Sequence, residues 1–254
     1  MREDNGVRRD QVELPLAGQD TGLSLVAYGH YGRPVLVFPS EAGRAWDFGN
    51  NGMVDAVADL VDAGRVKFYC VDSLDALTWA DKSLPVEERA RRAGAYTEWL
   101  VSQAVPWIRV DTGGGGELMA LGCSLGAYHA VHFALQRADL VPFAMGLSGN
   151  YDVGTWDAWG ERGDAAYFSN PADYVRHLHG DHLDWLRERL SVLIVCGQGQ
   201  WETNPTGSLP SSKELAALLQ EKGIRCELDL WGHDVKHDWP YWRRQLAHHL
   251  PRFC

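Results

Sequence analysis

The sequence lacks several features that would place it in other protein classes. It has no run of roughly 18 consecutive apolar residues, so no membrane span is expected. It opens on the charged stretch MREDNGVRRDQVELPL, without an apolar run of about 7–15 residues, so no secretory signal is expected. Only 24 side chains are basic against 34 acidic ones, giving a net charge of −10. That balance argues against nucleic acid or an anionic membrane as the main partner.

The five cysteines offer no framework for disulfides or for a zinc ribbon. Their number is odd, they are widely spaced, and no C-x-x-C pair occurs. Most lie in or beside strand-like segments, where a free cysteine acts as a small hydrophobic residue. Together with the missing secretory signal, this predicts a reducing, cytoplasmic location.

Short apolar runs alternate with helical patterns along the 254 residues, of which 45% are hydrophobic. This alternation predicts a doubly wound α/β fold around a mostly parallel sheet of about eight strands. The expected strands are Gln11–Ala17, Leu23–Tyr28, Val35–Phe38, Val66–Val71, Glu117–Leu121, Phe143–Leu147, Val192–Cys196 and Cys226–Leu230. The expected helices are Met53–Ala63, Val86–Ile108, Gly126–Gln136, Ser211–Lys222 and Pro240–Leu250, with Ser211, Ser212, Asp238 and Pro240 as start signals. The first two strands should pair antiparallel, and one domain is predicted over residues 1–254.

Residues 149–190 interrupt this alternation with an irregular stretch rich in Trp, Asp and His. An insertion between two strands of an α/β fold usually covers the site at the carboxyl ends of the strands. We therefore expect a lid-like, partly helical insertion. The chain has 11 Trp, and those near this edge predict an aromatic-lined cleft, with core and lid packing as the alternative. They are Trp46, Trp201, Trp231, Trp239 and Trp242, with Trp156, Trp159 and Trp185 in the insertion.

The strongest motif is Gly122-Cys123-Ser124-Leu125-Gly126, between an expected strand and an expected helix. A G-x-S-x-G sequence in a strand–turn–helix context is typical of a nucleophilic serine. The turn is so tight that it needs small residues two before and two after the serine, whose hydroxyl then lies at the positive end of the helix. The composition predicts about 0.1 such motifs by chance. The alternative is a tight turn without chemistry.

A serine nucleophile needs a general base, which in this fold comes last in the chain order serine, acid, histidine. His233 and His237 both follow the last expected strand. Gly232 and Pro240 indicate a loop there, which argues against a helical metal-binding pair. We favour His237 because it lies just ahead of the final helix.

The acid should follow the preceding strand, in the loop that begins at Gly197. Glu202 is the only carboxylate in that loop and is the expected acid, although a solvated loop glutamate is the alternative. Asp234 and Asp238 are the next candidates. The acid would orient the imidazole of the base and stabilise its charged form.

An oxyanion hole requires two convergent backbone N–H groups. We expect one from Leu125, directly after the nucleophile, and one from Glu41 in the loop after Val35–Phe38, with Ser40 next in line. The candidate substrate-binding side chains lie in loops at the same edge. They are Arg44, Trp46, Trp201 and Trp239, and covering the sheet edge is their alternative role.

The segments GCSLGAYHA, HDWPYWRRQL and VLVFPS together resemble the "putative esterase" branch of the α/β-hydrolases. That branch includes esterase D (S-formylglutathione hydrolase), feruloyl and enterochelin esterases, and the mycobacterial mycolyltransferases. The resemblance runs from about Leu25 to the end of the chain. It implies the α/β-hydrolase fold, His237 as the base, Glu202 as the acid and Glu41 as an oxyanion donor. The chain departs from many members at Ala127, where they have Gly, and at Gln198 and Gln200, near which they carry Asp.

A second pattern, H-x-H-x-D-H over His177–His182, matches the ligand run of metallo-β-lactamase-like zinc hydrolases. In that fold the run follows a strand near the N-terminal half, whereas here it lies within the insertion. Zinc ligands also need partners on rigid elements, which this segment does not suggest. A zinc-dependent hydrolase is therefore an alternative, and no metal is predicted.

The sequence as a whole predicts a serine carboxylesterase that forms an acyl-enzyme on Ser124 and needs no cofactor. Its partner should be a small-molecule ester, with neither nucleic acid nor membrane involved, and self-association is left open. The same residues are also compatible with an acyltransferase, and the fold with a non-catalytic binding protein on a hydrolase scaffold.

Overall fold

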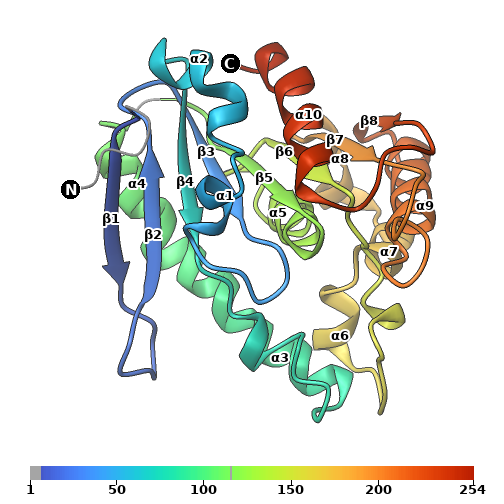
Figure 1. The fold of residues 1–254 in the computed structure, drawn as a ribbon. Helices are drawn as coiled ribbons and strands as arrows, with labels where there is room; N and C mark the ends of the chain where they lie inside the picture. The colour runs from blue at the N-terminus through green and yellow to red at the C-terminus, as the bar shows by residue number, and fades with distance from the viewer. Residues whose placement is uncertain (1–6, 115) are drawn as a thin grey trace.

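The computed structural model describes residues 7–114 and 116–254 and joins eight strands in one sheet (Figure 1). In chain order the strands are β1 (Arg9–Leu14), β2 (Leu23–Tyr28), β3 (Arg33–Phe38), β4 (Val66–Val71), β5 (Met119–Cys123), β6 (Phe143–Leu147), β7 (Ser191–Cys196) and β8 (Arg225–Leu230). Their spatial order is β1-β2-β4-β3-β5-β6-β7-β8. The pairs β1–β2 and β2–β4 are antiparallel, and all other pairs are parallel. The expected mostly parallel sheet and its antiparallel start are confirmed.

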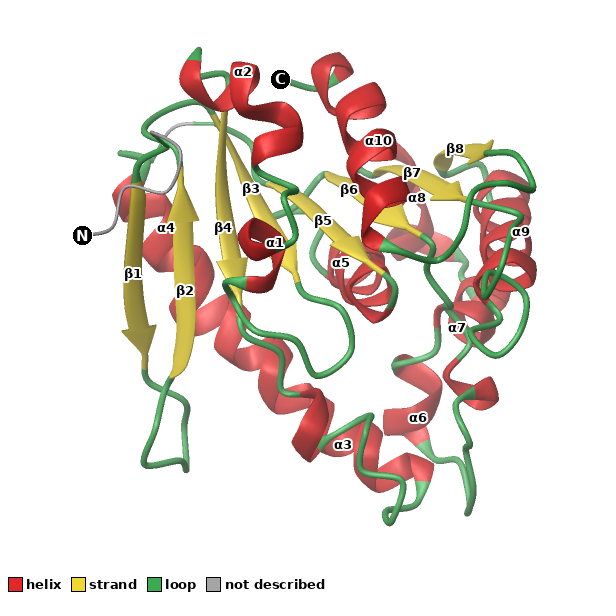
Figure 2. Cartoon of the chain, in the orientation of Figure 1, coloured by secondary structure: helices red, strands yellow, loops and turns green. Residues whose placement is uncertain are grey.

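Helices cover both faces of this sheet, which explains why its strands are nearly continuous apolar runs. Along β3, Val35 and Val37 point into one core cluster, and Leu36 and Phe38 point into the other. The first cluster is covered by α1 (Asp47–Asn50), α2 (Ala58–Asp62) and α10 (Trp239–His249). The second is covered by α3 (Val86–Trp99), α4 (Val105–Asp111), α5 (Leu125–Gln136) and α9 (Ser208–Glu221) (Figure 2). Because β3 to β8 run parallel, their carboxyl ends lie at one edge of the sheet.

Several helix boundaries differ from expectation. The expected helix Met53–Ala63 is a 3₁₀ turn at Asp55–Val57 followed by α2. The expected helix Val86–Ile108 is α3 and α4 joined by one π segment, Leu100–Ala104. Pro106 follows that segment and has no amide for an α-helical bond four residues back, which accounts for the wider turn. Ser211 and Ser212 were wrong as a helix start. Ser211 accepts a hydrogen bond from the Tyr151 amide at 2.7 Å, inside a helix that already begins at Ser208.

The last helix begins as expected. Asp238 precedes α10, and its carboxylate accepts a hydrogen bond from the Trp239 amide at 2.7 Å. Pro240 lies in the first turn, where no intrahelical amide is needed.

The insertion 149–190 is mostly helical. After a short 3₁₀ turn at Val153–Thr155 it forms α6 (Asp164–Phe168), α7 (Pro171–His177) and α8 (Gly180–Arg189). Apolar side chains of α7 and α8 join the core cluster that also contains α9. The expected lid therefore extends one helical layer of the sheet, and only its first residues approach the site described below.

Within residues 7–114 and 116–254, no helix combines the length and the apolar character needed to cross a membrane. All five cysteines are free, and three of them are buried. The start of the chain, residues 1–6, on which the expectation of no secretory signal partly rests, lies outside the described residues.

Candidate active site

Ser124 lies at the sharp turn between β5 and α5. Its backbone has φ 57° and ψ −124°, a conformation with positive φ that is uncommon for a residue other than glycine. A Cβ on Gly122 would lie 2.0 Å from the Gly126 carbonyl oxygen, and one on Gly126 would lie 2.4 Å from the carbonyl oxygens of Phe38 and Pro39. Both positions therefore require glycine, which is the physical content of the G-x-S-x-G motif.

Three residues from separate loops form a hydrogen-bonded chain at the carboxyl edge of the sheet. His237 Nε2 lies 2.9 Å from Ser124 Oγ, and His237 Nδ1 lies 3.0 Å from Glu202 Oε2. The Glu202 side chain is fully buried, and the His237 side chain is 10% exposed. The Trp242 ring meets the imidazole edge to face, with centroids 5.0 Å apart. The structure thus brings together the serine, the histidine and the acid that the sequence predicts.

The competing histidine and carboxylates lie elsewhere. His233 is exposed, and its Nδ1 is 3.4 Å from the Gln198 carbonyl oxygen. Asp234 is exposed, and Asp238 caps α10. Within the described parts of the chain, none of the three side chains forms a hydrogen bond with Ser124.

Main-chain hydrogen bonds join the loop that carries Glu202 to the loop that carries His237. The Gly199 amide donates to the Val235 carbonyl oxygen at 2.8 Å, and the His237 amide donates to the Gln200 carbonyl oxygen at 3.1 Å. A Cβ on Gly199 would lie 2.6 Å from the same Val235 oxygen, so the close approach of the two loops depends on glycine. Glu202 and His237 are therefore held as one unit.

A serine that the sequence did not single out completes the surroundings of the acid. Ser148 directly follows β6, is fully buried and has φ 55°. Its Oγ donates to Glu202 Oε1 at 2.6 Å and accepts from Trp242 Nε1 at 3.1 Å. The Gly197 amide also donates to Glu202 Oε1, at 3.3 Å. Ser148 could have been found from the sequence, because it lies just after a central strand, at the same edge of the sheet as Ser124.

A buried thiol also contacts the acid. Cys196 Sγ lies 3.5 Å from Glu202 Oε2. Burial, and then the nearby Glu202 charge, raise the pKa of this thiol well above its usual range. Cys196 therefore stays protonated and adds a weak donor to the carboxylate.

The two expected oxyanion donors face the same pocket. Leu125 is the first residue of α5, and Glu41 lies in the loop after β3. Both line the pocket that contains Ser124. In the part of the chain that the structure describes, neither backbone N–H has a protein acceptor. Free N–H groups at a helix start and in a neighbouring loop are suited to bind an anionic oxygen.

This pocket has a volume of about 290 Å³. Two aromatic walls, Trp79 and Trp156, pack edge to face with centroids 5.4 Å apart. The remaining lining is largely polar and includes Asn150, Thr206 and Ser208. The pocket thus combines an apolar wall with several hydroxyl and amide groups.

The four expected substrate-binding side chains do not line it. Arg44 pairs with Asp72 at 3.2 Å and covers the Trp46 ring, 5.0 Å from its centroid. Trp201 is 48% exposed, and Trp239 packs against Trp242. Of the tryptophans expected to form an aromatic cleft, Trp156 lines this pocket, whereas Trp46 and Trp239 do not and contact neighbouring side chains instead.

The His177–His182 run does not gather metal ligands. Its histidines are exposed; His177 Nδ1 lies 3.0 Å from the Asp173 carbonyl oxygen, and the His182 ring stacks on Trp185. The described residues contain one group whose ligand atoms lie within 4.8 Å of one another, namely Asp229, His248 and His249.

Protein contacts already account for that group. His249 Nε2 lies 2.9 Å from Asp229 Oδ2, and Arg252 Nη1 lies 3.1 Å from His249 Nδ1. Because the arginine donates to Nδ1, Nε2 must carry the proton that bonds Asp229, and a cation already lies beside the ring. Asp229, His249 and Arg252 therefore form a hydrogen-bonded network.

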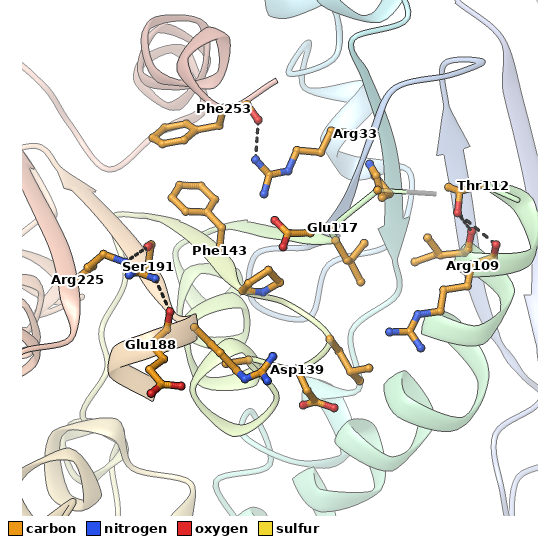
Figure 3. Close-up of a pocket in the computed structure, with 18 residues that line it drawn as sticks. Arg33, Arg109, Thr112, Glu117, Asp139, Phe143, Glu188, Ser191, Arg225 and Phe253 are labelled. Carbon is orange, nitrogen blue, oxygen red and sulfur yellow. Dashed lines mark hydrogen bonds between the residues drawn. The ribbon is translucent and has the colours of Figure 1, made fainter. Parts of the chain in front are cut away.

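A larger pocket, of about 660 Å³, lies at the amino ends of the parallel strands (Figure 3). Arg33, Phe143 and Arg225 line it at the starts of β3, β6 and β8. Arg33 Nη1 donates to the carbonyl oxygen of Phe253, another lining residue, at 2.7 Å. Since Ser124 lies at the opposite ends of these strands, this pocket is separate from the candidate active site.

Comparison with known proteins agrees with this architecture. Similar solved structures include a ferulic acid esterase, with 15% identity, 97% of each chain covered and a TM-score of 0.73. Mycobacterium tuberculosis MPT51 (FbpC1) is 12% identical over 96% of this chain and 97% of that one, with a TM-score of 0.71. S-formylglutathione hydrolase (FrmB) from Staphylococcus aureus is 11% identical over 98% of each chain, with a TM-score of 0.66. These likenesses confirm the α/β-hydrolase fold.

A search of curated proteins found no match to this sequence. A family model described as "Putative esterase" matches residues 41–253, which is most of the chain. The matched region contains the turn at Ser124 and the loops of Glu202 and His237, and the match supports ester hydrolysis. The chain therefore belongs to the "Putative esterase" family.

Proposed function

We propose that this protein is a carboxylesterase that cleaves small esters through an acyl-enzyme on Ser124. The observation that carries the proposal is the continuous hydrogen-bonded chain from Ser124 Oγ through His237 to the buried Glu202. A serine hydroxyl is a weak nucleophile until a base removes its proton, and the base must be held in one tautomer. Glu202 accepts from Nδ1, so Nε2 is left free to receive the serine proton.

In the first step Ser124 Oγ attacks the ester carbonyl carbon while His237 Nε2 takes the hydroxyl proton. The carbonyl oxygen becomes an oxyanion that accepts hydrogen bonds from the N–H groups of Leu125 and Glu41. The Glu202 carboxylate stabilises the imidazolium. The tetrahedral intermediate then expels the alcohol, which receives the proton from Nε2. Water adds to the acyl-enzyme by the same sequence and releases the acid, which restores Ser124.

The pocket supports a small ester with an apolar or aromatic face. Its volume of about 290 Å³ lies at the small end for ligand sites. Trp79 and Trp156 offer the apolar surface, and the lining also carries three charged side chains, Glu41, Lys82 and Asp157. A substrate need not carry a net charge to fit such a lining, and the ferulic acid esterase structure has the same fold.

Labelling with a fluorophosphonate probe and hydrolysis of p-nitrophenyl acetate test the proposal. Wild-type protein should form one adduct, located on Ser124 by mass spectrometry. Ser124→Ala should abolish the adduct, and Ser124→Ala and His237→Ala should each lower kcat by about 10⁴-fold or more. His233→Ala is the matched control from the same loop and should retain activity. An unlabelled wild type would refute the mechanism and favour a binding protein.

The same experiment separates the competing chemistries. Activity that persists in Ser124→Ala and is lost on chelation, with stoichiometric zinc in the purified protein, would assign the reaction to a metal. Adding a primary alcohol to the assay distinguishes the acceptors of the acyl group. Release of mainly free acid supports a hydrolase, whereas mainly new ester at millimolar alcohol would make the protein an acyltransferase.

A further inference from the structure

A buried carboxylate–imidazole pair lies behind the pocket, outside the chain of Ser124, His237 and Glu202. Asp75 follows β4 and its side chain is 1% exposed, and His129 belongs to α5 and its side chain is 8% exposed. His129 Nε2 lies 2.9 Å from Asp75 Oδ1. Neither residue lines the pocket that contains Ser124. The proposed reaction does not use them, yet a buried charge with a specific partner requires an explanation.

The second oxygen of Asp75 reaches the oxyanion loop. Asp75 Oδ2 accepts a hydrogen bond from the Ala42 amide at 3.2 Å. Ala42 directly follows Glu41 and has φ 52°, in the left-handed region that residues with a Cβ rarely adopt. The bond to Asp75 fixes the peptide between these two residues in the orientation that this backbone requires. It therefore sets the backbone position beside one oxyanion donor.

The other member of the pair, His129, is connected to the second oxyanion donor, Leu125, through α5. His129 lies in the helix whose first residue is Leu125. Its ring is packed on several sides, with the Phe38 ring stacked at 6.0 Å, Tyr96 at 5.4 Å and Tyr128 at 5.1 Å between centroids. The ring cannot move without the helix, so Asp75 is bonded to a fixed point on α5.

We propose that Asp75 and His129 are positioning residues that hold the two halves of the oxyanion hole in register. The two N–H donors come from loops after different strands, and both must lie about 2.7–3.1 Å from one developing oxygen. One buried carboxylate that accepts from Ala42 on one side and from His129 on the other is a rigid tie between those loops. The inference rests on the proposed esterase function and extends it to residues that touch no substrate.

The protein supplies a matched control for a merely structural role. His249 Nε2 and Asp229 Oδ2 form a second pair, also 2.9 Å apart, in which the histidine is buried. That pair joins α10 to β8 and does not line the pocket containing Ser124. Breaking it should lower stability without a selective effect on the oxyanion.

The test compares Asp75→Leu with Asp229→Leu, which remove each carboxylate and keep a side chain of similar size. The readouts are kcat and KM for p-nitrophenyl acetate, the thermal unfolding midpoint, and inhibition by a trifluoromethyl ketone. The ketone forms a tetrahedral adduct on serine whose oxygen occupies the oxyanion hole. Asp75→Leu should lower kcat by about 10²-fold and weaken the ketone by a similar factor, with KM changed by less than about threefold. Asp229→Leu should leave kcat and ketone inhibition within about twofold.

The conservative variant Asp75→Asn tests whether the hydrogen bonds of Asp75 are what matters. Asp75→Asn keeps a carbonyl oxygen for the Ala42 amide, while its NH₂ group can donate to the opposite tautomer of His129. It should recover kcat to within about tenfold of wild type. A folded Asp75→Leu with the same kcat and ketone inhibition as Asp229→Leu would overturn the proposal. So would an equal loss in Asp75→Asn and Asp75→Leu.

Should Asp75→Leu fail to fold, His129→Phe and His249→Phe replace the comparison. His129→Phe preserves the ring packing and removes the donor, so it should lower kcat by about tenfold relative to His249→Phe. Equal kcat values would overturn the proposal. Fluorophosphonate labelling of Ser124 in each variant keeps the two hypotheses apart. A wild type that is not labelled refutes the esterase, whereas a labelled wild type with unaffected Asp75 and His129 variants refutes only the positioning role.

Discussion

Glu202→Gln should inactivate the protein because the surroundings of Glu202 dictate how a glutamine would be oriented. At present Oε1 accepts from two donors, the Ser148 hydroxyl at 2.6 Å and the Gly197 amide at 3.3 Å. Oε2 accepts from His237 Nδ1 at 3.0 Å and, more weakly, from the Cys196 thiol at 3.5 Å. A glutamine has one acceptor and one donor group, so its oxygen should stay beside the Ser148 hydroxyl and the Gly197 amide, since His237 Nδ1 can become an acceptor and the Gly197 amide cannot. Its NH₂ group then faces His237.

That orientation traps the wrong tautomer of the base. An NH₂ group beside Nδ1 requires Nδ1 to accept, so the imidazole proton must reside on Nε2, opposite Ser124. Such a histidine cannot take the serine proton. Removing the charge of a triad acid while keeping its shape costs about 10⁴-fold in kcat, which is about 5.5 kcal/mol of transition-state stabilisation.

The double variant Ser148→Ala/Glu202→Gln tests whether the orientation of the glutamine amide causes the loss of activity. Ser148→Ala alone should lower kcat by about tenfold, because it removes one hydrogen bond to a charged acceptor. In the double variant only the longer Gly197 bond still holds the glutamine oxygen, so the preference for the orientation that turns NH₂ toward His237 falls by about one hydrogen bond, ~0.5–1.5 kcal/mol. The double variant should therefore be up to about tenfold faster than Glu202→Gln alone, whereas additivity predicts that it would be slower.

The assay is the steady-state kcat for p-nitrophenyl acetate, with Asp234→Asn as the control for loss of a nearby acid. Thermal unfolding of each variant checks that the fold is retained. A Glu202→Gln variant within tenfold of wild type would remove Glu202 from the mechanism. A double variant slower than Glu202→Gln would refute the role of Ser148 in orienting the amide.

Three further outcomes follow from the described contacts. Burial raises the pKa of Glu87, but three backbone N–H groups at the start of α6 outweigh it and lower that pKa below 4.5. Glu87→Gln should therefore reduce the free energy of unfolding in urea by about 1 kcal/mol at pH 7, and the difference should vanish as the pH falls through the lowered pKa. Gly126→Ala should destabilise the fold by about 2–3 kcal/mol and abolish turnover, because its Cβ would lie 2.4 Å from two carbonyl oxygens; a normal unfolding midpoint would contradict this. Trp156→Ala should raise KM about tenfold with little change in kcat, whereas the exposed Trp159→Ala should not.

Several buried strands could be predicted closely from the sequence because burial on both faces leaves an unbroken apolar run, whereas β5 lies two residues later than the expected Glu117–Leu121. The expected ranges Leu23–Tyr28, Val66–Val71 and Phe143–Leu147 match the structure to the residue. The edge strand β1 begins two residues before its expected start, since its polar side chains alternate with apolar ones and mark no clear boundary. Ser211 has the usual chemistry of a helix start, but its hydroxyl is used in a tertiary contact with Tyr151. Propensity alone cannot distinguish these two uses.

Site residues could be predicted from local sequence where the chemistry allows few residue types. A serine flanked by glycines, a histidine before the last helix and a lone loop carboxylate were all found from local sequence. Ser148, Asp75 and His129 were missed because each acts through a contact far away along the chain, such as Ser148 with Glu202. The role of several tryptophans was predicted wrongly because of contacts close by in the chain. A ring such as Trp46 can pair with its neighbour Arg44 as readily as with a ligand.

The ties between the loops of Glu202 and His237 decide how this part of the chain can vary in evolution. Both ties, from Gly199 to Val235 and from His237 to Gln200, use main-chain atoms on each side. They therefore depend on the number of residues in each loop and, apart from the glycine, hardly on their identity. Substitutions in the two loops leave these hydrogen bonds in place, but an insertion or deletion in either loop would move Glu202 and His237 relative to each other. We therefore expect these loops to tolerate substitutions better than changes in length.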